Sequence, residues 1–321
     1  MSSPFLIAIV KSITWEAEGV ISIELHPAPG SSAFVNFEPG SHIDLNLPNG
    51  LVRSYSLLND SRESNRYVVA VLKDAKSRGG SKFIHEQLHV GTTLQISKPR
   101  NNFPLESSEK KKVLVAGGIG VTPILGMLRY LRAHDAEVDF IYCARSRKQA
   151  AFLADIEAFT NHRIRLQCHF DDEMNRPPDL KKLLVGYSDD THLYCCGPVP
   201  MLTAFEDACN HHAYENFHIE RFSIKEPVST DMKSGYTIEL KKSGKFIAVA
   251  AGQSVLDALL AEGLNPEHSC REGLCGACET RVLCGEVEHL DSILTKKEQI
   301  ANKSMMICVS HGKGDVLVLD I

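Results

Sequence analysis

Four of the ten cysteines have a spacing that suits metal chemistry. Two irons bridged by two sulfides need four thiolates, and the plant-type pattern takes three from one loop and a fourth from a distant strand. Gly273 and Gly276 lie in the loop, and small residues let backbone N–H groups approach the sulfurs. A zinc ribbon usually has two C-x2-C knuckles, whereas this segment has one. The spacing therefore predicts a 2Fe–2S cluster. Its predicted ligands are Cys270, Cys275, Cys278 and Cys308.

The remaining cysteines give no such pattern. None occurs before Cys143, and in a reducing compartment they are not expected to form disulfides. Cys284 lies just outside the cluster pattern, and we expect it to be buried as a small apolar side chain.

A second group of residues suits a phosphate and a flat ring. Arg53, Ser54, Tyr55 and Ser56 end a predicted strand, and Arg78, Gly79, Gly80 and Ser81 open a predicted helix. Glycines let the backbone approach a phosphate, helix N-terminal amides favour an anion, and arginines add charge-assisted bonds. Tyr55 offers a flat face for an isoalloxazine ring, and Ser56 offers a hydroxyl for ring N5. Either segment alone is equally typical of a capped surface turn, so the flavin interpretation depends on the pair.

A third group suits a dinucleotide. A short apolar run ends in Gly117, Gly118, Ile119 and Gly120, and Thr122 and Pro123 then begin a helical pattern. Pro123 breaks the G-x-G-x-x-G fingerprint, so a tight structural turn is the alternative. Cys196, Gly197 and Pro198 end another predicted strand. Because open α/β sheets bind ligands at the carboxyl ends of their strands, we expect Cys196 at the edge of the crevice and Cys195 buried.

The elements around these residues predict a multidomain chain. Residues 1–106 contain short alternating strands and one helix near 81–88, which predicts an antiparallel β-barrel. Residues 107–224 alternate strands with helices, which predicts an α/β domain with a parallel sheet. Residues 225–235 are polar and resemble a linker. Residues 236–321 contain a hairpin, a helix, the cysteine loop and a last strand, which predicts an α+β domain.

Composition narrows the function further. The 321 residues are 43% hydrophobic and 23% charged, with a formal net charge of -5. These values are ordinary for a globular protein, and the absence of a long basic run argues against nucleic-acid binding. The apolar run at residues 5–10 is too short for a signal-peptide core or a membrane span, so we expect a first strand there. A cytoplasmic protein without membrane partners is expected.

These motifs, in this order, resemble those of the phthalate dioxygenase reductase family, which includes the vanillate demethylase reductases. The likeness covers nearly the whole chain. It implies an FMN-binding barrel, a NAD-binding domain and a C-terminal plant-type ferredoxin domain. It also implies that electrons pass from NADH through FMN and the cluster to a Rieske non-haem iron oxygenase in a transient complex. The alternatives are an FAD-containing reductase with another acceptor, and NADPH bound through Arg145 and Arg147.

The resemblance also assigns roles to individual residues. The expected catalytic residues are Ser56, Thr122 and Cys196. Phe222 is expected to cover the other face of the flavin, although a single aromatic residue near a linker is often only packing. The expected cofactor-binding residues are Arg53, Ser54, Tyr55, Ser56, Lys73, Arg78, Gly79, Gly80, Ser81, Gly118, Gly120, Thr122, Gly197 and Phe222.

Overall fold

The computed structural model describes residues 5–75, 77–108, 110–223 and 235–321. The chain divides into two compact units, Met1–Phe222 and Ser223–Ile321. The predicted linker lies outside the described residues except for Gly235. In the part of the chain that the structure describes, no helix is long and apolar enough to cross a membrane.

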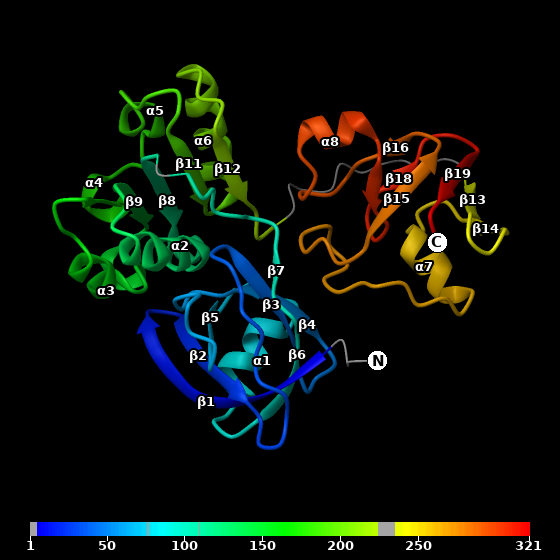
Figure 1. Cartoon of the computed structure of the whole chain (residues 1–321), viewed down its shortest axis with the longest axis horizontal. Helices are drawn as coiled ribbons and strands as arrows, with labels where there is room; N and C mark the ends of the chain where they lie inside the picture. Colours follow the sequence, from blue (N-terminus) through cyan, green and yellow to red (C-terminus); the bar gives the residue numbers. More distant parts are fainter. Residues whose placement is uncertain (1–4, 76, 109, 224–234) are drawn as a thin grey trace. The chain divides into compact units, whose positions relative to one another are not determined.

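The first unit begins with an antiparallel sheet (Figure 1). Its strands are β1 (Phe5–Ala17), β2 (Val20–Pro27), β3 (Ser41–Asn46), β4 (Val52–Ser56), β5 (Tyr67–Leu72), β6 (Thr93–Ser97) and β7 (Arg100–Asn101). Six of them pair in the order β4-β3-β6-β1-β2-β5, and β7 pairs with β3. Alternating residues point inward, so Ile23, Leu45 and Ile96 are buried in one core. The end strands β4 and β5 contact each other, which closes the expected barrel.

One helix, α1 (Gly80–Gln87), covers the barrel between β5 and β6. Its N-cap, Gly79, has φ +98°, a left-handed conformation that favours glycine. Ile84 is buried on the inner side of the helix. The helix occupies the place that the sequence predicts.

A parallel sheet follows in the same unit. Its strands are β8 (Lys112–Gly117), β9 (Val138–Ala144), β10 (Ile164–Phe170), β11 (His192–Cys196) and β12 (Phe217–Glu220), in the order β10-β9-β8-β11-β12. The connecting helices are η1 (Gly118–Gly120), α2 (Val121–Ala133), η2 (Arg147–Gln149), α3 (Leu153–Ala158), α4 (Asp171–Met174), α5 (Leu180–Leu183) and α6 (Val199–His211). All neighbouring strands are parallel, so their carboxyl ends lie along one edge.

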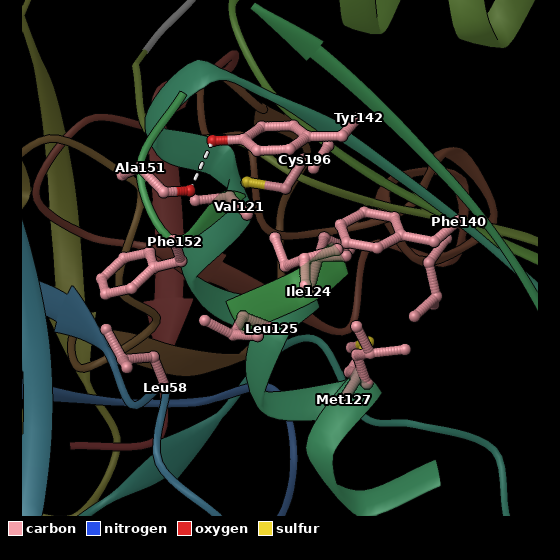
Figure 2. Packing of buried hydrophobic residues seen from close by; sticks show 14 of the residues in the cluster. Leu58, Val121, Ile124, Leu125, Met127, Phe140, Tyr142, Ala151, Phe152 and Cys196 are labelled. Carbon is pink, nitrogen blue, oxygen red and sulfur yellow. Dashed lines mark hydrogen bonds between the residues drawn. The ribbon is translucent and has the colours of Figure 1, made fainter. Parts of the chain in front are cut away.

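The barrel and the parallel sheet share a continuous apolar core around α2. Figure 2 shows Leu125 of α2 beside Leu58 of the barrel segment that follows β4. A Cβ at Gly126 would lie 2.9 Å from the carbonyl oxygen of Leu57, so glycine permits this close packing. Arg129 donates to the carbonyl oxygen of Leu58 at 2.6 Å. The predicted boundary at residues 106 and 107 lies inside this unit and stays a prediction.

The second unit has the expected α+β composition. Its strands are β13 (Tyr236–Leu240), β14 (Lys245–Val249), β15 (Glu279–Cys284), β16 (Val287–Glu288), β17 (Ser304–Met306), β18 (His311–Gly312) and β19 (Val316–Leu319). Its helices are α7 (Val255–Ala261) and α8 (Lys296–Ala301). The main sheet has the order β14-β13-β19-β15-β17, and β16 pairs with β18. Leu256 and Leu259 of α7 are fully buried in the core of this unit.

One expectation about the second unit is wrong: Cys284 is exposed, not buried. The pairing of β15 with β19 shifts register between Val282 and Cys284. Val282 therefore faces the core, while Leu283 and Cys284 are both exposed. A bulge of this kind interrupts the alternation that would otherwise place Cys284 on the same face as Val282, so its small apolar side chain does not reach the core.

Candidate functional site

Two glycine-containing turns meet at the carboxyl edge of the parallel sheet. The turn η1 follows β8, and Gly197 with Pro198 follows β11. A Cβ at Gly120 would lie 2.7 Å from the backbone nitrogen of Gly197, and a Cβ at Gly117 would lie 2.8 Å from Pro198 Cδ. Side chains at these positions would push the turns apart, so the close approach requires glycine. The structure thus brings together the two segments that the sequence assigned to one nucleotide site.

The residues of the first turn differ in their surroundings. Gly118 has φ +54°, and no atom lies within 4 Å of the place where its Cβ would be. Thr122 is buried, and its hydroxyl donates to the carbonyl oxygen of Ile119 at 3.1 Å. The thirteen-residue helix α2 begins here, and among the described residues no side chain caps it. The open glycine backbone of η1, directly before a helix N-terminus without a side-chain cap, suits a diphosphate.

Cys196 and Glu220 lie side by side at the same edge. Their backbones pair in register at the ends of β11 and β12. Cys196 is fully buried, and burial raises the pKa of its thiol well above the usual value. Burial also raises the pKa of Glu220 to about 8, and within the described residues its Oε2 has no hydrogen-bond partner. Glu220 is half-buried as a residue, but a buried carboxylate oxygen without a partner is costly, which marks Glu220 as a functional candidate.

Sequence reasoning did not identify Glu220. A single glutamate at a strand end has no motif of its own, and its burial depends on neighbouring strands. The available hint was its position directly before the Arg221–Phe222 segment. Arg221 is held by Glu206 at 2.7 Å, and Phe222, the predicted flavin cover, is exposed just beyond β12.

In the barrel, Arg53 lies across the start of α1. A Cβ at Gly80 would be 2.6 Å from Arg53 Nε, so glycine leaves the space that the side chain occupies. Among the described residues no side chain caps α1 at Gly79. A guanidinium and uncapped helix amides in one place suit a phosphate dianion. These residues therefore fit the phosphate group of a flavin nucleotide.

The other predicted flavin residues surround this position. Tyr55 packs against the barrel core, and burial raises its pKa to about 12. Ser56 is buried at the end of β4. Ser54 instead donates to Asp44 Oδ1 at 2.6 Å, which joins it to an Asp44–Arg100 ion pair.

Lys73, Arg78 and Ser81 belong to the two ends of the β5–α1 connection. Lys73 forms an ion pair with Glu86 of α1 at 3.0 Å. The Ser81 hydroxyl accepts from the backbone N–H of Asp74 at 3.3 Å. Arg78 directly precedes the Gly79 cap. Arg53, Gly80 and Ser81 thus lie together at the start of α1, whereas the side chain of Lys73 is paired at the last turn of that helix.

In the second unit, the four predicted cluster cysteines form two pairs. The thiol of Cys275 donates toward Cys270, which lowers the pKa of Cys270 and raises that of Cys275. Cys308 donates toward Cys278, with the same opposite shifts. Throughout the described residues, no group of three or more His, Cys, Asp or Glu side chains is arranged to hold a metal ion. Two thiol pairs fit a cluster in which each of two irons takes two protein ligands.

Backbone amides of the loop also point at these sulfurs. The N–H of Glu272 donates to Cys270 Sγ at 3.3 Å, and the N–H of Cys270 donates to Cys275 Sγ at 3.5 Å. Gly273 has φ +66°, which bends the loop where a side chain would meet Val309. Such amides stabilise thiolate charge, so the donor set fits an iron–sulfur cluster.

A known protein family matches a segment of each of the two units. A model described as an oxidoreductase NAD-binding domain matches residues 114–207. A model described as a 2Fe-2S iron-sulfur cluster binding domain matches residues 238–312. The first covers η1 and the Cys196 turn, and the second covers all four paired cysteines.

Relatives match nearly the full length. The phenoxybenzoate dioxygenase subunit beta of Ectopseudomonas oleovorans is 40% identical over 97% of this chain and 96% of its own length. The vanillate O-demethylase oxidoreductase of Pseudomonas putida is 40% identical, with 98% and 99% covered.

Solved structures agree with these matches. The whole chain matches all of a phthalate dioxygenase reductase with 33% identity and a TM-score of 0.71. An intact type IV self-sufficient cytochrome P450 monooxygenase is 38% identical with a TM-score of 0.89, and this chain spans 41% of its length. The chain therefore belongs to the phthalate dioxygenase reductase family, as an oxidoreductase with a NAD-binding domain and a 2Fe–2S domain.

Proposed function

We propose that this protein is the NADH-dependent reductase component of a Rieske-type oxygenase system and that it carries FMN. One observation supports this most directly. A single chain combines a nucleotide-binding sheet edge, an anion cradle at Arg53 and Gly80, and four thiols in two pairs. A nicotinamide delivers two electrons as hydride, a bound flavin can release electrons singly, and a 2Fe–2S cluster carries one.

Each set of residues has its own task in this function. The η1 turn and the start of α2 hold the diphosphate of the coenzyme. Cys196 and Glu220 close the far side of that site with neutral, buried groups, which exclude water. Arg53 and the α1 amides hold the flavin phosphate. The four cysteines hold the cluster, Cys270 with Cys275 and Cys278 with Cys308.

FMN is favoured over FAD by the anion cradle. Arg53 and the start of α1 form a compact site for a terminal phosphate dianion, which FMN has and FAD lacks. The resemblance to the phthalate dioxygenase reductase family implies the same choice.

The acceptor is inferred from the relatives. Several full-length relatives are named as parts of dioxygenase, monooxygenase or demethylase systems. A Rieske-type oxygenase bound in a transient complex is therefore the proposed partner, and redox encounters of this kind use small interfaces. Among the described residues all cysteines are free, which suits the reducing cytoplasm in which we place the protein.

The alternative is a reductase that contains FAD or serves a different acceptor. The likeness to a self-sufficient P450 monooxygenase favours this second acceptor class. Flavin released from the purified protein and separated by chromatography decides between FMN and FAD. Stopped-flow reduction of a Rieske oxygenase and of a P450 by the NADH-reduced protein decides between acceptors. Faster P450 reduction, or FAD in the extract, would contradict the proposal.

A further inference from the structure

The carboxyl edge of the parallel sheet continues past the glycine turns toward β9 and β10. A dinucleotide with its diphosphate at η1 and its nicotinamide toward β11 and β12 must place its adenosine half on this other side. Strands β9 and β10 lie roughly 5 and 10 Å from β8 at normal strand spacing. The residues that follow them would therefore line the adenosine half of a coenzyme bound in this way. They include the basic Arg145 and Arg147 and the acidic Asp171, Asp172 and Glu173.

Arg147 already has two neighbours on this side. Its Nε donates to Glu173 Oε1 at 2.7 Å. Its guanidinium lies over the ring of Phe170, 4.5 Å from the ring centroid. The hydrogen bond that Arg147 donates to Glu173 is the main cause of the raised pKa of Arg147. The guanidinium that could receive a 2′-phosphate is thus paired with a carboxylate of the same chain.

The backbone keeps the two loops together. The N–H of Asp172 donates to the carbonyl oxygen of Arg145 at 3.1 Å, so the loop after β9 is tied to the start of α4. Phe170 and Ala144 pair in register at the ends of β10 and β9. Glu173 and Arg147 therefore stay near each other without depending on their own exposed ion pair, which by itself is weak.

We propose that Glu173 is a specificity-determining residue that makes this site prefer NADH to NADPH. The 2′-phosphate of NADPH would approach the Glu173 carboxylate beside Arg147, and these two anions would repel each other. The 2′-hydroxyl of NADH can instead donate to a carboxylate. This inference rests on the proposed function, which places the coenzyme at this edge.

The test is the substitution Glu173→Gln, which removes the charge and keeps the size. Steady-state reduction of ferricyanide is measured with NADH and with NADPH on the holoenzyme. We expect kcat/KM for NADPH to rise by about tenfold, while the value for NADH changes by less than about threefold. The matched control is Asp135→Asn, which removes a carboxylate that pairs with Arg163 before β10, at the amino edge of the same sheet.

A second variant tests the part played by Arg147. In the Glu173→Gln background, Arg147→Ala is expected to remove most of the gain with NADPH, because the released guanidinium is then missing. An NADPH gain no larger than that of Asp135→Asn overturns the inference, as does a gain that survives Arg147→Ala. Wild-type protein that reduces ferricyanide with neither coenzyme overturns the proposed function itself.

Discussion

At the residue scale, Arg53 carries the flavin assignment. The Arg53 side chain fills the space beside Gly80, because a Cβ at position 80 would lie 2.6 Å from Arg53 Nε. That arrangement couples a strand-end cation to the start of α1. Neither segment would attract a dianion as strongly alone, since helix amides and a guanidinium add their effects.

Arg53→Ala should therefore weaken FMN binding. A charge-assisted hydrogen bond contributes about 1.5–3 kcal/mol, which corresponds to a rise in Kd of roughly 10- to 150-fold. Fluorescence titration of flavin-free protein with FMN measures this change. Arg62→Ala is the control, because Arg62 is an exposed barrel arginine paired with Asp60. An unchanged Kd in Arg53→Ala would show that the phosphate binds elsewhere.

Glu220 makes a prediction about pH. Burial raises its pKa from 4.5 to about 8 in the folded protein. Between these values the folded state keeps a proton that the unfolded state releases, so stability falls as the pH rises toward 8. The contribution of this group is fully present below about pH 4.5.

Glu220→Gln should remove that dependence. The Tm of the variant relative to wild type is expected to increase as the pH is raised from about 5 to about 8. Calorimetric scans of both proteins at several pH values measure the difference. A difference that stays constant across this range means that Glu220 titrates like an ordinary carboxyl group.

At the element scale, the two glycine turns hold the nucleotide site together. Gly120 faces the backbone of the Cys196–Gly197 turn, whereas Gly118 faces open space. A side chain at Gly120 must displace the backbone of the neighbouring turn. A side chain at Gly118 meets no such obstacle and costs only the strain of a positive φ.

Gly120→Ala should therefore raise KM for NADH and lower Tm by more than Gly118→Ala does. We expect the KM effect of Gly120→Ala to exceed about tenfold, since displaced turn amides lose contact with the coenzyme diphosphate. Steady-state kinetics and thermal unfolding of both variants provide the comparison. Equal losses of Tm in Gly120→Ala and Gly118→Ala would contradict the close packing of the two turns.

Most of the strands, turns and helices could be predicted from the sequence, because each depends mainly on residues that are close together along the chain. The β8–η1–α2 segment follows from an apolar run, glycines and Pro123. Long-range effects could not be read in this way. The polar segment before β8 gave no hint that Lys112 is buried, with its Nζ donating to the carbonyl oxygens of Ser108 and Lys110. The exposure of Cys284 and the burial of Glu220 likewise depend on neighbouring strands.

At the scale of the whole molecule, the redox sites divide between the two units. The nucleotide edge and the proposed flavin site lie in Met1–Phe222, and the paired thiols lie in Ser223–Ile321. Each unit has its own apolar core. Hydride acceptance and single-electron delivery should therefore be separable by a change confined to the second unit.

The direct test of this division is Cys275→Ser, with two acceptors assayed side by side. Ferricyanide reduction by NADH should stay within about twofold of wild type, while cytochrome c reduction should fall by more than about tenfold, because only the latter needs the cluster. Cys284→Ser, at an exposed cysteine outside the pairs, should leave both rates unchanged. Equal loss of both activities in Cys275→Ser, or full retention of both, would contradict electron flow from nicotinamide through the first unit to a cluster in the second.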